Sequence, residues 1–321
     1  MVRLVKQRRN FVVLAAAMLV AAAPAAPLDW AFPGVGPKPA AIPPTRVYRL
    51  PGSAKSFTEA QRRDRTHALD WLPNEHPPAP RAVLAHKEGA CGYCHLVNGV
   101  GRSENAQLRG LPVDYIEEQV RAFASGTRRS ARPSMPSDYM ATVARTVSRA
   151  ELRAAAVYFS RLEPQRHAKV IEATTIPRAS PEGFLYAFDP SAREPLGNRI
   201  IEGAVSAERH RLHDPHEQTI AFVPTGSLTR GAALANRGTA KSPACATCHT
   251  AHFVGIGGES PSYIARQLAG FRARTRNDPG AAPMQGVAAT LSDAQILDLA
   301  AYLGSRPPWT RAQMAASLAN E

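Results

Sequence analysis

The chain contains four cysteines, and all four belong to two short motifs of the form Cys-x-x-Cys-His. The motifs are Cys91-Gly92-Tyr93-Cys94-His95 and Cys245-Ala246-Thr247-Cys248-His249. Two thiols three positions apart at the start of a helix can form thioethers with the two vinyl groups of one porphyrin, and the adjacent His then faces the iron. The motifs therefore predict two covalently bound haems c, each with a His as the proximal iron ligand.

Other chemistries explain the same residues less well. A zinc site built from two Cys-x-x-Cys pairs usually has them about 15–20 residues apart, whereas Cys94 and Cys245 are 151 positions apart, since 245 minus 94 is 151. Structural disulfides would leave His95 and His249 unexplained at the same offset. A thioredoxin-like motif needs a strand followed by a helix, which neither site indicates.

An internal repeat surrounds the motifs. Tyr115, Ile116, Gln119, Val120 and Phe123 recur as Tyr263, Ile264, Gln267, Leu268 and Phe271, and 263 minus 115 is 148. A later part recurs with a different offset, because Met140, Val143, Ala144 and Ser148 match Met284, Val287, Ala288 and Ser292, and 284 minus 140 is 144. The repeat indicates two related units, one around each motif.

Each unit is predicted to contain a motif helix, a middle helix, a loop with a Met, and a closing helix. The middle helices are indicated by apolar residues at helical spacing, such as Ile116, Val120 and Phe123. The closing helices should start at Ser148 and Ser292, because Glu and Gln follow them three positions later in the capping-box arrangement.

Met140 and Met284 are the candidate distal ligands of the two irons. A thioether suits haem iron, and His/Met ligation raises the reduction potential relative to ligation by two His. An isolated Met is usually core filler, but the repeat places these two at equivalent positions. Met135 lies nearby in a Pro-rich run and is predicted to be a loop residue outside the repeat register.

The two units resemble the domains of cytochrome c4, a two-haem periplasmic electron carrier. The likeness runs from Tyr263-Ile264 through Gln267-Leu268 and Phe271 to Ala301-Tyr302. The first unit also resembles a group of two-haem exported cytochromes, through Asp70-Trp71, His76-Pro77-Pro78 and Gly99-x-Gly101-Arg102-x-Glu104-Asn105. The resemblance implies electron transfer by two haems, but cytochrome c4 has a short linker where this chain has about 60 residues.

The expected fold is mainly α, with two small helical cytochrome c domains, a long irregular N-terminal extension and a connector. The predicted segments are a signal peptide (1–26), the N-terminal extension (27–80), the first unit (81–165), the connector (166–222), the second unit (223–308) and a C-terminal tail (309–321). The extension is expected to pack over the first unit. In the connector, residues 199–201 and 219–223 look extended.

The N-terminus is typical of an export signal. Arg3, Lys6, Arg8 and Arg9 precede the apolar run 11–22, and small residues at 23–25 offer a cleavage site. This predicts a periplasmic protein cleaved near residue 25, and no later stretch is long and apolar enough to span a membrane.

The basic composition bears on the partners. The net charge of +13 favours an acidic redox protein or an anionic membrane face, and export argues against nucleic acid. His210, His213 and His216 are spaced by three, but without Cys or paired carboxylates they are weak evidence for a metal site. His86 and His252, which lie near the motifs, are weak alternative ligands.

The predicted activity is one-electron transfer without bond making. The main alternative is a cytochrome subunit of a larger dehydrogenase or oxidase complex, which the long extensions would suit. A diheme peroxidase would need one open iron site with an acid-base group beside it, and two filled distal positions argue against that. Thiosulfate-oxidising diheme enzymes that use a Cys ligand are disfavoured because the chain has no spare Cys.

Overall fold

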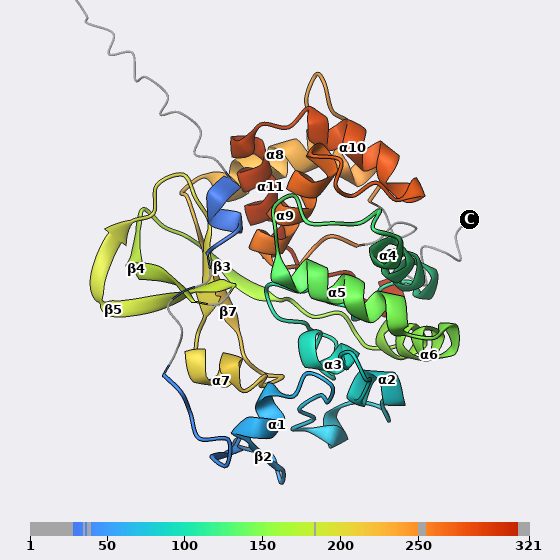
Figure 1. The fold of residues 1–321 in the computed structure, drawn as a ribbon. Helices are drawn as coiled ribbons and strands as arrows, with labels where there is room; N and C mark the ends of the chain where they lie inside the picture. The colour runs from blue at the N-terminus through green and yellow to red at the C-terminus, as the bar shows by residue number, and fades with distance from the viewer. Residues whose placement is uncertain (1–27, 35, 37–39, 183, 250–254, 314–321) are drawn as a thin grey trace, which may run out of the picture.

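The computed structural model describes residues 28–34, 36, 40–182, 184–249 and 255–313. The predicted signal peptide and His252 lie outside the described residues. Figure 1 shows the helices of the two units on one side of the molecule and a sheet on the other. Within the described ranges, no helix combines the length and the apolar character needed to cross a membrane.

The first unit is helical. Its elements are α2 (Arg81–Leu84), α3 (Cys91–Cys94), α4 (Val113–Ser125), α5 (Met135–Thr146) and α6 (Arg149–Ser160). Helix α6 begins as predicted, because Ser148 accepts a hydrogen bond from the backbone N–H of Glu151 and the Glu151 side chain accepts one from the Ser148 backbone. A buried cluster that includes Ile116, Ala156 and Phe159 forms the core of this unit.

The second unit repeats this arrangement. Its elements are α8 (Ser227–Arg237), η3 (Cys245–Thr247), α9 (Pro261–Arg272), η4 (Pro279–Ala281), α10 (Ala282–Ala289) and α11 (Asp293–Ser305). The closing helix α11 is capped by Ser292 and Gln295 in the same reciprocal way. The predicted middle and closing helices are therefore confirmed in both units.

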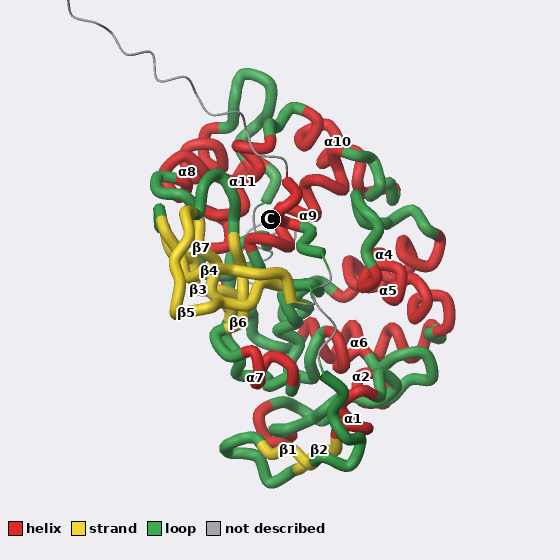
Figure 2. Tube along the Cα trace, turned by 60° about the vertical axis from the view of Figure 1, so that its left-hand side comes forward, coloured by secondary structure: helices red, strands yellow, loops and turns green. Residues whose placement is uncertain are grey.

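The connector is more regular than expected, so the mainly α prediction is only partly confirmed. It contains β3 (Ala168–Glu172), β4 (Thr175–Glu182), β5 (Leu185–Pro195), β6 (Ile201–Ala204), α7 (Ala207–Arg211) and β7 (Thr219–Val223). The strands form one sheet in the order β3-β7-β6-β5-β4, which Figure 2 shows as a single yellow layer beside the helices. The extended runs at 199–201 and 219–223 correspond to the approach to β6 and to β7.

The prolines that suggested an irregular connector are placed where a sheet tolerates them. Pro177 and Pro181 lie in β4, which is an edge strand. Pro190 lies in a bulge of β5, because the pairing jumps from Arg178↔Asp189 to Pro177↔Arg193. The remaining strand proline, Pro195, is the last residue of β5. The prolines therefore did not exclude strands, because they lie in an edge strand, in a bulge and at a strand end.

The N-terminal extension contacts all three other segments, and not only the first unit. Its elements are η1 (Leu28–Ala31), β1 (Val47–Arg49), β2 (Ser56–Thr58), α1 (Glu59–Arg63) and η2 (Pro73–Glu75). The η1 residues Leu28, Trp30 and Ala31 are buried in the core of the second unit. The backbone near Arg65 and Ala68 bonds to the first unit. Leu69 and Trp71 pack with Leu212 of the connector.

Trp71 anchors the extension to the connector, and its replacement by Phe should destabilise the fold. The Trp71 indole is 1% exposed, and its Nε1 donates to the Leu212 carbonyl at 2.7 Å. Trp71→Phe leaves that buried carbonyl without its donor, which should lower the free energy of unfolding by about 1–3 kcal/mol. Denaturant unfolding measures this, with Trp309→Phe as control, because Trp309 is 39% exposed and should change little. Equal effects in the two variants would contradict the prediction.

Candidate haem sites

The first Cys-x-x-Cys-His motif forms one tight helical turn. Helix α3 starts at Cys91, and the backbone N–H of His95 donates to the Cys91 carbonyl at 2.9 Å. Cys91 packs against the core of the first unit. Burial raises the pKa of Cys91 to about 12 and that of Cys94 to about 11. Both cysteines are partly buried.

The His95 imidazole is oriented as a haem ligand. Its Nδ1 lies 2.8 Å from the Ala106 carbonyl, and because a carbonyl only accepts, Nδ1 must carry the proton. The lone pair of Nε2 is then available for a metal. Burial lowers the pKa of His95, which favours the neutral imidazole that metal binding needs.

A tight loop places the Ala106 carbonyl beside His95. Gly101 has φ +76°, and a Cβ built on it would lie 2.6 Å from the Ala106 oxygen. Only Gly fits this close backbone approach without strain. Gly101 therefore contributes to the orientation of the proximal His, although it contacts no ligand itself.

The second motif shows the same turn in a less buried setting. The backbone N–H of His249 donates to the Cys245 carbonyl at 2.8 Å, which reproduces the His95–Cys91 bond. Cys245 and Met284 both pack against the core of the second unit. The structure thus brings the predicted attachment residue and the predicted distal ligand of this unit to one core.

The Met-bearing segments are helices, which corrects the prediction of a loop. Met140 lies within α5 and Met284 within α10. Met135, predicted to be a loop residue, is the first residue of α5 and is 47% exposed. The helices form because a Pro at the second position of each is compatible with a helix N-terminus, so the Pro-rich runs start helices instead of breaking them.

Helix α5 packs beside the chain that leads into the first motif. The Tyr139 hydroxyl donates to the Glu88 carbonyl, and a Cβ on Gly89 would lie 3.1 Å from Val143. Val143 and Ala144 are buried, and Met140 precedes them by three and four residues, so it shares their helix face. Met140 is therefore on the buried side of α5.

Two buried arginines join the units across a pseudo-symmetric seam. Arg128 donates to Gln119 Oε1 of its own unit at 2.7 Å and to Gln267 Oε1 of the second unit at 3.0 Å. Arg276 repeats this, donating to Gln267 at 3.2 Å and to Gln119 at 2.8 Å. Arg128 also donates to the Tyr263 hydroxyl at 2.9 Å. The repeat matched Gln119 with Gln267, and Arg128 and Arg276 have the same offset, since 276 minus 128 is 148. The sequence did not reveal that these side chains meet.

This seam has the character of an anion site. Arg128 and Arg276 are 7% and 6% exposed, and among the described residues no carboxylate oxygen lies within 4.0 Å of either guanidinium. Arg276 Nε is buried without a hydrogen-bond partner. Because an unpaired buried charge is costly, the seam fits the carboxylate-bearing propionates of a haem. The residues present are thus compatible with the predicted cofactor.

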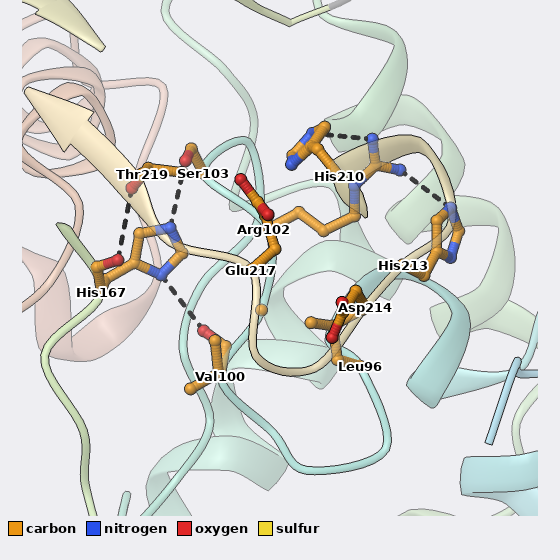
Figure 3. Close-up of a pocket in the computed structure, with 11 residues that line it drawn as sticks. Leu96, Val100, Arg102, Ser103, His167, His210, His213, Asp214, Glu217 and Thr219 are labelled. Atoms are coloured by element: carbon orange, nitrogen blue, oxygen red, sulfur yellow. Dashed lines mark hydrogen bonds between the residues drawn. The ribbon is translucent and has the colours of Figure 1, made fainter. Parts of the chain in front are cut away.

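The connector histidines contact the first unit and the N-terminal extension. Figure 3 shows a small pocket in which Arg102 lies between two of them. Arg102 donates to His210 Nε2 at 3.0 Å and to His213 Nε2 at 3.3 Å. His216 instead pairs with Glu75 at 2.5 Å. Burial lowers the pKa of His210 to about 3, so the imidazole is neutral and can accept from Arg102.

Comparison with known proteins finds similarity to cytochromes. Residues 226–303 match the family model described as cytochrome C oxidase, cbb3-type, subunit III. The thiosulfate dehydrogenase electron acceptor of Thiomonas intermedia (strain K12) is 26% identical over 249 residues, covering 75% of this chain and 87% of that protein. Cytochrome c4 of Stutzerimonas stutzeri is 25% identical over 229 residues, and the match covers 68% of this chain and 84% of that protein.

Among solved structures, reduced recombinant cytochrome c4 from Pseudomonas stutzeri matches with a TM-score of 0.44 and 23% identity, covering 67% of this chain and 93% of that chain. The sequence matches confirm the resemblance to cytochrome c4 and the prediction of c-type haem. They also agree with electron transfer as the activity, since the matched proteins are electron-transfer cytochromes.

Proposed function

We propose that this chain is a periplasmic electron carrier in which Cys91, Cys94, Cys245 and Cys248 attach two haems c. His95 and His249 are the proximal ligands, and Met140 and Met284 the distal ligands. The observation that carries the proposal is the repeated turn, in which a His N–H bonds to the first Cys carbonyl in both motifs. When bound, the haems supply reversible one-electron chemistry.

The residues around the first site have distinct parts in this function. The Ala106 carbonyl holds the Nδ1 proton of His95 and so keeps Nε2 directed to a ligand. The apolar core against which Cys91 packs lowers the local polarity on one side of the attachment site, which favours the less charged ferrous state. Arg128 and Arg276 would hold propionates between the units, and their positive charges favour the reduced state as well.

The electron donor is proposed to be a dehydrogenase. The Thiomonas relative is named as the electron acceptor of thiosulfate dehydrogenase, and the match spans most of both chains. An acceptor of this kind receives electrons from an enzyme without performing the oxidation itself. The partner is therefore a redox protein with an acidic face or a membrane-bound one, as the basic surface favours.

The proposed function predicts two covalent haems per chain and the reversible uptake of two electrons. A pyridine haemochrome assay should give two haems per chain after acid-acetone extraction, and intact mass should exceed that of the bare mature polypeptide by two haem groups. A redox titration should take up two electrons per chain. A bare polypeptide mass would refute the proposal, and rapid turnover of hydrogen peroxide with a reduced donor would favour a peroxidase instead.

A further inference from the structure

The two attachment motifs differ sharply in how much the rest of the chain covers them. The three positions that follow the first Cys can be compared one by one. Gly92, Tyr93 and Cys94 of the first motif correspond to Ala246, Thr247 and Cys248 of the second. In the first motif Gly92 is buried and the other two are partly buried, whereas all three positions of the second motif are exposed. The same chemical unit is thus presented in two different environments.

The cover over the first motif comes from the connector and the N-terminal extension. The Tyr93 ring stacks edge-on against the His213 ring, with centroids 4.6 Å apart, and the Tyr93 hydroxyl donates to the Arg62 carbonyl at 3.2 Å. The outer side of α3 is therefore closed by the connector and the extension, whereas among the described residues Ala246, Thr247 and Cys248 of the second motif stay exposed.

Further bonds fasten this cover to the loop behind the motif. Arg102 donates to His210 and His213, and Asn98 Nδ2 donates to the Pro215 carbonyl at 3.1 Å. Trp71 of the extension holds the Leu212 carbonyl from the other side. Residues 210–215 thus accept hydrogen bonds from the first unit and from the N-terminal extension, and these bonds hold the cover in place.

The open motif is preceded along the chain by exposed positive charge. The sequence contains no Asp or Glu between Glu217 and Glu259. Within that stretch Arg237 and Lys241 are exposed just before Cys245, whereas Arg230 is paired with Asp298. An exposed basic surface of this kind steers and orients an acidic partner surface.

We propose that protein partners exchange electrons with this chain at the second motif only, through an acidic face that docks on the surface around Arg237, Lys241 and Thr247. The first haem, whose attachment edge the connector closes, then exchanges electrons only with the second. The inference rests on the proposed function, because it assumes a haem on each motif. Electron transfer slows steeply with distance, so a covered edge is a poor point of exchange.

The chain supplies a matched pair of lysines for the test. Lys241 precedes Cys245 by four residues, and Lys87 precedes Cys91 by four residues; both are exposed. In stopped-flow experiments at low ionic strength, the fully reduced holoprotein is oxidised by the anionic probe hexacyanoferrate(III). Lys241→Glu should slow this reaction about fivefold, because charge reversal repels the anion at the site of exchange. Lys87→Glu should leave the rate unchanged.

A cationic oxidant, tris(1,10-phenanthroline)cobalt(III), should give the opposite sign for Lys241→Glu, an acceleration, which a structural disturbance would not produce. An equal or larger effect of Lys87→Glu would overturn the inference. Failure of the wild-type protein to be oxidised by either probe would instead refute the proposed function. Binding of the holoprotein to phosphatidylglycerol vesicles that is lost in Lys241→Glu would assign this surface to a membrane and overturn the acidic-protein partner.

Discussion

Replacement of Met284 or Met140 by Ala should lower the reduction potential of one haem by on the order of 100 mV, because axial ligands are the main control of haem potential. Loss of the thioether removes the ligand that favours the ferrous state. Each variant should also lose about half of the weak long-wavelength band that Met ligation gives ferric haem c. Redox titration followed by absorbance measures both effects.

Helix geometry makes Met135→Ala the appropriate control. Met140 is partly buried and precedes the buried residues Val143 and Ala144 by three and four positions, which places it on the same face of α5. Met135 lies five residues earlier, away from that position, and is 47% exposed. A side chain with that exposure is a poor candidate for a ligand in a closed haem site.

The expected pattern is therefore a loss in Met140→Ala and in Met284→Ala, with Met135→Ala unchanged. Carbon monoxide should bind the ferrous form of the two affected variants, since each has an open iron position. If Met135→Ala, and not Met140→Ala, removed the long-wavelength absorbance of the first haem, the ligand assignment from the repeat register would be wrong.

The parts of the fold that could be predicted are those fixed by local chemistry. The capping pairs Ser148–Glu151 and Ser292–Gln295 located the starts of α6 and α11, because each cap is complete within four residues. The Met helices were missed. The Pro-rich run around Met135 indicated a loop, whereas Pro136 stands in the first turn of α5, as Pro283 does in α10.

The connector sheet and the cover over the first motif could not be predicted in the same way. The strand pair β3–β7 joins residues about 50 positions apart, and nothing in either strand specifies the partner. The contact of Tyr93 with His213 spans 120 positions, since 213 minus 93 is 120. The spacing of His210, His213 and His216 was only weak evidence for a metal site. Spacing shows which side chains can share a face, but it does not show which residues lie opposite that face.

The seam between the units illustrates the same limit. The repeat aligned Gln119 with Gln267 and Arg128 with Arg276, and it indicated that these positions are equivalent. Only the structure shows that each guanidinium bonds to a Gln of both units. Two buried cations would repel each other, so equivalence alone would have suggested separate surface sites.

Arg128→Met should lower the reduction potentials of both haems, because a buried cation near a haem favours the less positive ferrous state. At a separation on the order of 10 Å and an effective dielectric of about 20, one charge contributes about 1.7 kcal/mol, which is about 70 mV for one electron. Met retains the length of the Arg stem but removes the charge. Arg121→Met is the control, since the Arg121 side chain is 59% exposed and solvent screens its charge.

The reach of Arg128 into both units makes the prediction specific. Its guanidinium bonds to Gln119 and Gln267, so its loss acts on both sides of the seam, and Arg276→Met should give the same result by the pseudo-symmetry. Redox titration that resolves the two haems provides the measurement. A shift confined to one haem would mean that the arginines serve their own units separately, and no shift in either haem would show that the seam holds the units together without acting on the cofactors.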